Sequence, residues 1–251
     1  MFRFYITDEQ ICNDEIFIEG GDVNHIRNVL RLEKGDWVVA CNGEGKDYVS
    51  RIASIEKEQV VLQVEKVQET GTELPTKITL FQGLPKKDKM EFIIQKAVEL
   101  GVYEIIPVAM KNCVVKLDAK KAAAKTARWQ GIAESAAKQS KRSLIPKVSE
   151  PVSYKEAVAY AMKLDQKLVP YENERGMAAT REAVEAVRPG ESIGIFIGPE
   201  GGFAPEEIEA VKGEMKLISL GSRILRTETA GFTTLAILMY HIETSCPEKS
   251  N

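Results

Sequence analysis

The sequence has few of the residues that build metal or disulfide frameworks, with four cysteines and two histidines among 251 residues. Cys12, Cys41, Cys113 and Cys246 form no Cys-x-x-Cys pair, which excludes a zinc ribbon or finger and argues against a disulfide framework. No apolar run approaches the roughly 20 residues of a membrane helix; the best, Phe232–Tyr240, is about half as long. The N-terminus also lacks a signal-peptide core. We therefore predict a cytoplasmic protein with reduced thiols and no metal.

Positive charge is concentrated in one part of a chain whose net charge is −3. Residues 77–147 contain 15 Lys and Arg against 6 Asp and Glu, a local charge of +9, whereas the remainder carries −12. Such a block can attract RNA because each neutralised phosphate releases counterions. The alternative is a set of solvated helix faces, above all for Lys120, Lys121 and Lys125.

The first 70 residues predict a small β-barrel that is too small to be the catalytic body. Alternating or β-branched runs predict strands at 2–6, 37–41, 48–52 and 59–67, with a hairpin turn at 42–46. Only 22–32 reads as a helix, with Asp22 as a possible N-cap and Gly35 closing the turn after it. The polar segment Gln68–Pro75 predicts a linker, so we expect domains at 1–70 and 71–251.

From Lys77 onward, strand and helix patterns alternate, which predicts an α/β domain with a parallel sheet. The expected strands are 78–82, 102–108, 167–170, 192–197 and 217–220. The expected helices are 89–100, 118–141, 177–187, 205–211 and 229–244. Ligands of such sheets bind in the loops that follow the carboxyl ends of the strands.

Two of these loops carry unusual residues. The first, Ile197–Pro205, contains three glycines that allow backbone to approach a ligand closely. It is neither a P-loop nor a Gly-x-Gly-x-x-Gly fingerprint, because Glu200 lies within it and no lysine follows. A phosphate cradle and an unliganded glycine-rich turn both remain open.

The second loop, Leu220–Ala230, combines guanidinium groups with apolar residues just after a strand. Arg223 and Arg226 could hold phosphate or polarise a carbonyl group. Thr227 and Glu228 could equally be a helix cap and a first-turn carboxylate. That explanation leaves Ile224 and Leu225 unexplained, and these two side chains favour an apolar pocket.

Other residues indicate a functional site less clearly than the two loops do. Arg27 and Arg31 are four residues apart on one predicted helix face, beside which Arg3 could present another positive charge to a polyanion. A plain surface helix is the alternative. His25 and His241 form no Ser-His-Asp arrangement.

Taken together, these motifs resemble the bacterial 16S ribosomal RNA uridine-N3 methyltransferases, a branch of the SPOUT superfamily. The resemblance runs in order over nearly the whole chain, through Phe2-Arg-Phe-Tyr5, His25-x-x-x-Val-Leu-Arg31, Gly83-Leu-Pro-Lys86 with Lys89, Ala97-x-Glu-Leu-Gly101, Trp129-x-x-Ile-x-x-Glu-Ser-Ala-x-x-Gln139, Arg142 with Pro146, Ile197-Gly-Pro-Glu-Gly-Gly202 and Leu220-Gly-x-Arg-Ile-Leu-Arg-Thr-Glu-Thr-Ala230.

The resemblance implies an N-terminal PUA-like or OB-like barrel for RNA docking and a C-terminal SPOUT α/β domain with a deep trefoil knot, an exception to unknotted topology. It implies a homodimer that binds S-adenosylmethionine between the two loops. The implied substrate is one uridine in the decoding-site helix of 16S rRNA within the small ribosomal subunit.

The implied reaction needs positioning and a way to remove the uracil N3 proton. Arginine cannot act as an ordinary base, so we assign Arg31 and Arg226 as stabilisers of the uracil anion and keep Glu228 as a possible base. The residues expected to bind the cofactor are Pro170, Tyr171, Glu172, Ile197, Gly198, Pro199, Gly201, Gly202, Leu220, Gly221, Ile224, Leu225 and Arg226. Those expected to bind RNA are Arg3, Arg27, Arg31, Lys86, Lys89, Arg128, Lys138 and Arg142.

Three other functions remain open. A ribose 2′-O-methyltransferase of the same superfamily would have a similar pocket and a different product. A non-catalytic RNA-binding ribosome assembly factor would have no affinity for S-adenosylmethionine. A nucleotide-binding α/β enzyme would use Gly198–Gly202 for phosphate, against which the missing lysine and Glu200 argue.

Overall fold

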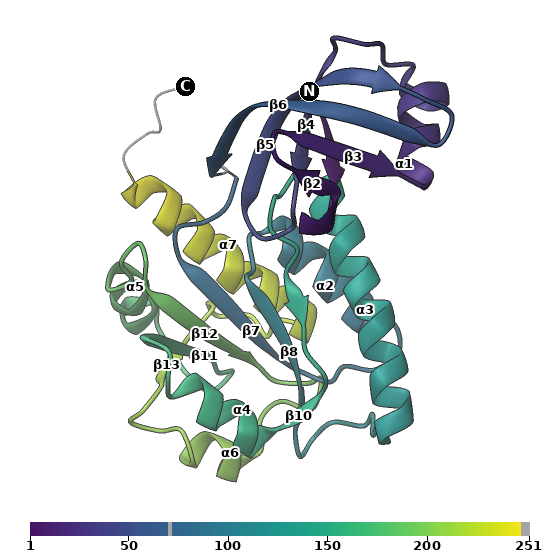
Figure 1. The fold of residues 1–251 in the computed structure, drawn as a ribbon. Helices are drawn as coiled ribbons and strands as arrows, with labels where there is room; N and C mark the ends of the chain where they lie inside the picture. The colour runs from purple at the N-terminus through teal and green to yellow at the C-terminus, as the bar shows by residue number, and fades with distance from the viewer. Residues whose placement is uncertain (70–71, 247–251) are drawn as a thin grey trace. The chain divides into compact units, whose positions relative to one another are not determined.

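The chain divides into two compact units, each with its own sheet (Figure 1). The computed structural model describes residues 1–69 and 72–246. The first unit comprises 1–73 together with 137–145, and the second comprises 74–136 and the chain from Pro146 onward. Thr70 and Gly71, at the centre of the expected linker, lie outside the described residues. No sequence pattern indicated that 137–145 joins the first unit.

The first unit is built on a six-stranded mixed sheet in the order β1-β4-β5-β6-β3-β2. Its β1–β4 pair is parallel and the other pairs are antiparallel. The strands are β1 (Phe2–Tyr5), β2 (Ile11–Cys12), β3 (Glu15–Glu19), β4 (Trp37–Cys41), β5 (Lys46–Ile55) and β6 (Gln59–Glu69). The four predicted strands are therefore present, whereas β2 and β3 were not expected.

The helical segment of this unit differs from its prediction. It consists of a short α1 (Gly21–Asn24) followed by one turn of π-helix, η2 (His25–Leu30). Gly20 with a positive φ, and not Asp22, is the N-cap. A π-turn widens the helix, so the four-residue spacing of Arg27 and Arg31 no longer defines one α-helical face. Arg31 ends the segment in the left-handed conformation, with φ 53°.

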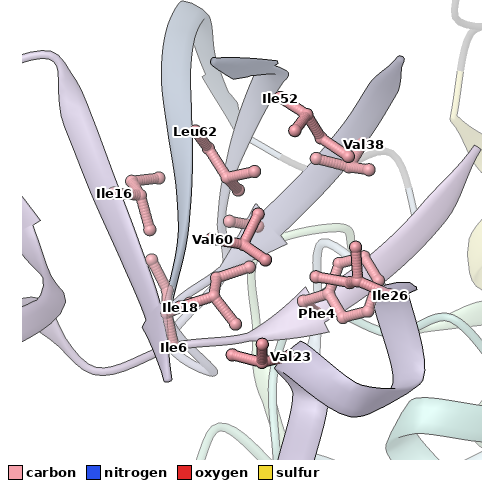
Figure 2. Close-up of a cluster of buried hydrophobic side chains, with 11 residues drawn as sticks. Phe4, Ile6, Ile16, Ile18, Val23, Ile26, Val38, Ile52, Val60 and Leu62 are labelled. Carbon is pink, nitrogen blue, oxygen red and sulfur yellow. The ribbon is translucent and has the colours of Figure 1, made fainter. Parts of the chain in front are cut away.

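The core of the first unit is a cluster of hydrophobic side chains from its sheet and from the α1–η2 segment (Figure 2). Ile16 and Ile18 of β3 face Val60 and Leu62 of β6 in this cluster, and all four are 0–1% exposed. Burying one such side chain stabilises the fold by about 1.5–3 kcal/mol. The alternation of Ile16 and Ile18 is the period-two signal that identifies β3 as a strand.

A buried ionic network joins residues 137–145 to this sheet. Arg3 donates to both carboxylate oxygens of Asp47, at 2.7 and 2.8 Å, and Ser143 donates to Asp47 at 2.6 Å. Arg142, 4% exposed, donates to Glu73 at 2.6 Å, and its carbonyl accepts from the Tyr5 hydroxyl. Arg3 and Arg142 are both expected to contact RNA phosphates, and in the structure each guanidinium pairs with a carboxylate of its own unit, Arg3 with Asp47 and Arg142 with Glu73.

The second unit holds a seven-stranded sheet in which every pair is parallel. The order is β10-β8-β7-β12-β11-β13, with β9 also paired to β8. The strands are β7 (Lys77–Gly83), β8 (Glu104–Ala109), β9 (Lys147–Val148), β10 (Val152–Ser153), β11 (Gln166–Pro170), β12 (Ser192–Ile197) and β13 (Lys216–Ile218). The predicted parallel α/β domain is confirmed, with β9 and β10 as unforeseen short strands.

Helices accompany these strands as the sequence predicted, with one addition. They are α2 (Lys89–Glu99), α3 (Ala119–Gln139), α4 (Tyr154–Ala161), α5 (Ala178–Glu185), α6 (Pro205–Glu209) and α7 (Thr227–Ser245). The unexpected α4 begins with a capping box between Ser153 and Glu156. Among the described residues, no helix is both long and apolar enough to span a membrane.

Candidate active site

The carboxyl ends of β11, β12 and β13 surround one cavity of about 360 Å³, a size typical of small-molecule sites. Three loops of the second unit supply most of its lining, and Lys89 adds a side chain from α2. Twelve of the thirteen residues expected to bind a cofactor line it: Pro170, Tyr171, Glu172, Ile197, Gly198, Pro199, Gly202, Leu220, Gly221, Ile224, Leu225 and Arg226.

Gly201 is the exception, because it does not line the cavity. A Cβ atom at this position would lie 3.0 Å from the Cβ of Asn112, so the absence of a side chain serves packing behind the loop. The Asn112 amide donates to the carbonyl oxygens of Gly201 and Gly202, at 3.1 and 3.3 Å. Asn112 thus fixes the first loop from outside, a role that no sequence motif indicated.

Two other glycines give the cavity its shape. Gly202 has φ +66°, and a Cβ there would lie 3.2 Å from the carboxylate of Glu172. A Cβ on Gly198 would lie 3.2 Å from the Phe203 ring. Glycine therefore suits both positions. Gly202 has a left-handed backbone conformation, and at both Gly198 and Gly202 a side chain would press on a residue that also lines the cavity.

The second loop brings polar and apolar groups to the opposite side of the cavity. Arg223, Ile224, Leu225 and Arg226 all contribute to its lining, as their spacing suggested. The side chain of Ile224 is largely in solvent, with the residue 83% exposed. An apolar ligand group that covered Ile224 would remove this surface from water.

Thr227 links the two loops through hydrogen bonds. Its hydroxyl donates to the carbonyl oxygen of Gly198 at 2.6 Å and accepts from the amide nitrogen of Gln82 at 2.9 Å. Gln82 lies fully buried on β7, opposite Ile197 of β12. Thr227 is therefore not the helix cap considered above, since Arg226 occupies the N-cap position of α7. The sequence offered no signal for Gln82.

Lys89 stands between two carboxylates at the cavity. Its ammonium lies 3.3 Å from Glu200 of the first loop and 3.2 Å from Glu228 in the first turn of α7. Although desolvation opposes it, the hydrogen bonds to Glu228 and Glu200 raise the pKa of Lys89. Desolvation likewise opposes ionisation of Glu200, yet backbone N–H donors, including that of Lys86, and the Lys89 ammonium lower the pKa of Glu200. Both groups are therefore charged at neutral pH.

The remaining predicted residues have varied environments. Arg31 and Arg27 are exposed in the first unit, where Arg27 donates to the Lys57 carbonyl at 3.0 Å. Lys138 is exposed over the Tyr5 ring, also in the first unit. In the second unit, Lys86 is exposed, and Arg128, also exposed, pairs with Glu91 at 2.8 Å. The structure thus brings the predicted cofactor residues together around one cavity, and Arg226 is among them. Glu228 forms an ion pair with Lys89, which lines this cavity. Arg31 belongs to the first unit.

Lys121 and Lys125 lie on an ordinary solvated face of α3. Lys121 pairs with Asp118 at 3.2 Å, and the Lys125 ammonium lies over the ring of Trp129. These contacts fit the alternative considered for this lysine cluster. We do not assign it to RNA.

Comparison with known families assigns a class to both units. Residues 72–239 match the family described as RNA methyltransferase domain, and residues 18–65 match the RNA methyltransferase PUA domain. The fold and the cavity therefore define an α/β RNA methyltransferase domain joined to a PUA domain.

Individual relatives make the family more specific. Ribosomal RNA small subunit methyltransferase E of Bacillus subtilis (strain 168) is 38% identical over 97% of this chain and 98% of its own length. The crystal structure of the Neisseria gonorrhoeae ribosomal RNA small subunit methyltransferase E bound to S-adenosyl methionine is 34% identical, with a TM-score of 0.76 over 94% of this chain and 96% of that one. A Legionella pneumophila methyltransferase in complex with bound SAM is also 34% identical, with a TM-score of 0.78 over 95% and 97% of the two chains. The chain belongs to the ribosomal RNA small subunit methyltransferase E family.

Proposed function

We propose that this protein transfers the methyl group of S-adenosylmethionine to N3 of one uridine in the decoding-site helix of 16S rRNA, acting on the small ribosomal subunit in the cytoplasm. The observation that carries this proposal is the cavity at the ends of β11, β12 and β13, which is lined by both the glycine-rich and the arginine-rich loop. Relatives of similar length that share this architecture bind S-adenosylmethionine.

The residues of the cavity fit this cofactor. Gly198 and Gly202 leave backbone groups exposed where side chains would otherwise fill the space, which suits hydrogen bonding to an adenine edge. Leu220, Ile224 and Leu225 supply apolar surface for the adenine ring, and Glu172 supplies negative charge for the cationic end of the molecule. When bound, S-adenosylmethionine supplies an activated methyl group; the chain supplies position and electrostatics.

Methylation at N3 also requires that the N3 proton of uracil be removed at this cavity. Arg226 lines the cavity and stabilises negative charge on the uracil oxygens, and Glu228, which pairs with the cavity-lining Lys89, is the base. The assignment of Arg31 as a second stabiliser requires this residue of the first unit to meet the substrate uridine. An Arg31→Ala variant that methylates at the wild-type rate would remove Arg31 from this role.

RNA docking completes the proposal. The first unit, whose six-stranded sheet we propose to be the predicted small barrel, presents Arg27, Arg31 and Lys138, and the second adds Lys86, Lys89 and Arg128 at or near its surface. Phosphate contacts of this kind supply affinity, while the shape of the RNA supplies much of the specificity. We take residues 1–70, with the added segment 137–145, as the RNA-docking domain.

Two features of the proposal concern topology and assembly. The loops after β12 and β13 form a deep trefoil knot around the cofactor. The apolar groove between α5 and α7, which includes the exposed Met177 and Tyr240, is the face through which two copies form a homodimer.

Calorimetric titration of S-adenosylmethionine, followed by mapping of the methylated nucleotide in small subunits, tests the function. Micromolar binding together with one N3-methyluridine supports it. Methyl on a ribose oxygen would favour the 2′-O-methyltransferase, while RNA binding without cofactor binding, even with small subunits present, would favour an assembly factor.

A further inference from the structure

We propose that Lys89, Glu228 and Arg226 together read the base-pairing edge of the target uracil, with Glu228 accepting the N3 proton, so that this triad selects uracil over cytosine. The inference rests on the proposed function and deepens it. It reassigns Lys89 from phosphate contact to base recognition, and it separates the roles of the two glutamates beside Lys89.

The hydrogen bonds distinguish Glu228 from Glu200 as a base. Glu200 is held by the backbone N–H of Lys86, at 3.0 and 3.3 Å to its two oxygens, and by Lys89 at 3.3 Å. A carboxylate stabilised in this way is a weak base. Glu228 pairs with Lys89 through Oε2, and among the described residues no hydrogen bond or ion pair to its Oε1 is seen. The Glu228 side chain is 15% exposed, and its partner Lys89 lines the cavity.

Two cationic groups retain unused donors: Lys89, which pairs with Glu228, and Arg226, which precedes Glu228 by two residues in the chain. An ammonium group has three N–H donors, and Glu200 and Glu228 occupy two on Lys89. Within residues 1–69 and 72–246, the Arg226 guanidinium has no carboxylate partner. Both Lys89 and Arg226 line the cavity.

This set of groups matches the uracil edge. Uracil presents an acceptor, a donor and an acceptor at O4, N3–H and O2. A carboxylate with a cationic donor on each side presents the complementary order of donor, acceptor and donor, and these two positions are assigned to Lys89 and Arg226. Cytosine carries an amino donor at position 4 and an unprotonated N3, so it would place a donor against a cation and a lone pair against the carboxylate. Such mismatched buried polar groups give strong discrimination.

The chemical step follows from the same groups. The N3 proton moves to Oε1 of Glu228, and the electron pair left on N3 attacks the methyl carbon. The new N3–C bond forms as the S–C bond breaks, and its electron pair remains on sulfur, which becomes a neutral thioether. Lys89 and Arg226 stabilise the negative charge that develops on O4 and O2 meanwhile.

The decisive variant is Glu228→Gln, with Glu206→Gln as control because Glu206 is an exposed first-turn glutamate of α6 outside the cavity. We expect Glu228→Gln to bind S-adenosylmethionine within about twofold of wild type and to lose at least about 100-fold in methylation rate. Its remaining rate should rise about tenfold per pH unit, because hydroxide must then remove the N3 proton. A methylation rate or a pH profile equal to that of Glu206→Gln would overturn the assignment.

Lys89→Met tests the recognition part, with Lys96→Met on the same helix as control. Methionine keeps the apolar stem of lysine and removes the donor. We expect Lys89→Met to lose discrimination between small subunits carrying uridine and those carrying cytidine at the target, with cofactor binding retained. Unchanged discrimination would overturn this part. If wild-type protein itself bound no S-adenosylmethionine, the proposed function would fail instead, so the two failures are distinguishable.

Discussion

At the scale of single residues, the conformation of Gly202 should control cofactor binding. Its φ of +66° costs an alanine about 1–2 kcal/mol, and the new Cβ would also press on Glu172 across the cavity. We expect Gly202→Ala to weaken S-adenosylmethionine binding by about tenfold, measured by calorimetry.

Gly213 offers a matched control for this prediction. It has φ +89°, nothing lies within 4 Å of its hypothetical Cβ, and it does not line the cavity. Gly213→Ala should therefore lower the melting temperature and leave the affinity unchanged. Equal losses of affinity in both variants would show that strain alone, without the contact to Glu172, explains the effect.

The four thiols should differ in reactivity according to burial. Desolvation raises the pKa of Cys41 to about 11 and also raises the pKa of the buried Cys113, whereas Cys12 is exposed. Since the thiolate is the reactive form, iodoacetamide at mildly alkaline pH should alkylate Cys12 and spare Cys41 and Cys113. Mass spectrometry of tryptic peptides measures this, and unfolding in denaturant should abolish the protection. Modification of Cys41 as fast as Cys12 in the folded protein would contradict the prediction.

At the scale of elements, Thr227 couples the start of α7 to the loop after β12. Thr227→Val keeps the shape of the side chain but leaves the Gly198 carbonyl without its donor, at a cost of about 1–3 kcal/mol. We expect about tenfold weaker binding of S-adenosylmethionine in this variant. Thr227→Ser, which keeps the hydroxyl, should restore most of the affinity.

Thr234 provides the comparison on the same helix. It is 2% exposed and does not itself line the cavity, and its hydroxyl donates to the Ala230 carbonyl within α7. Thr234→Val should bind the cofactor like wild type. A Thr227→Val variant that did the same would refute the coupling.

At the scale of the whole molecule, the apolar groove between α5 and α7 should hold two copies together. Tyr240 is 69% exposed and lines this groove, so Tyr240→Glu would place a charge within the proposed interface. Sedimentation velocity should show a dimer for wild type and a monomer for Tyr240→Glu. Val114→Glu, at a residue 67% exposed outside the groove, should remain dimeric, and a monomeric wild type would exclude the homodimer.

The sequence by itself determined the local elements and the position of the pocket along the chain. Period-two and period-3.6 patterns identified β4, β12 and α2 closely, because buried side chains recur at the spacing of the backbone. The rule that parallel sheets bind ligands at their carboxyl ends then located both loops, and all but one of the expected cofactor residues line the cavity. Patterns failed where conformation is unusual, as in the π-turn at His25–Leu30.

Only the tertiary structure decided which polar groups meet. Arg3 and Arg142 look like RNA ligands in the sequence, but Asp47 and Glu73, each more than 40 positions away, enclose them. Gln82, Thr227 and Gly198 form one hydrogen-bonded set although 145 positions separate the first two. Lys89 likewise meets Glu200 and Glu228 from far along the chain. A charge in a sequence has no partner until folding supplies one, because ion pairs and hydrogen bonds depend on distances of a few ångströms that local patterns do not encode.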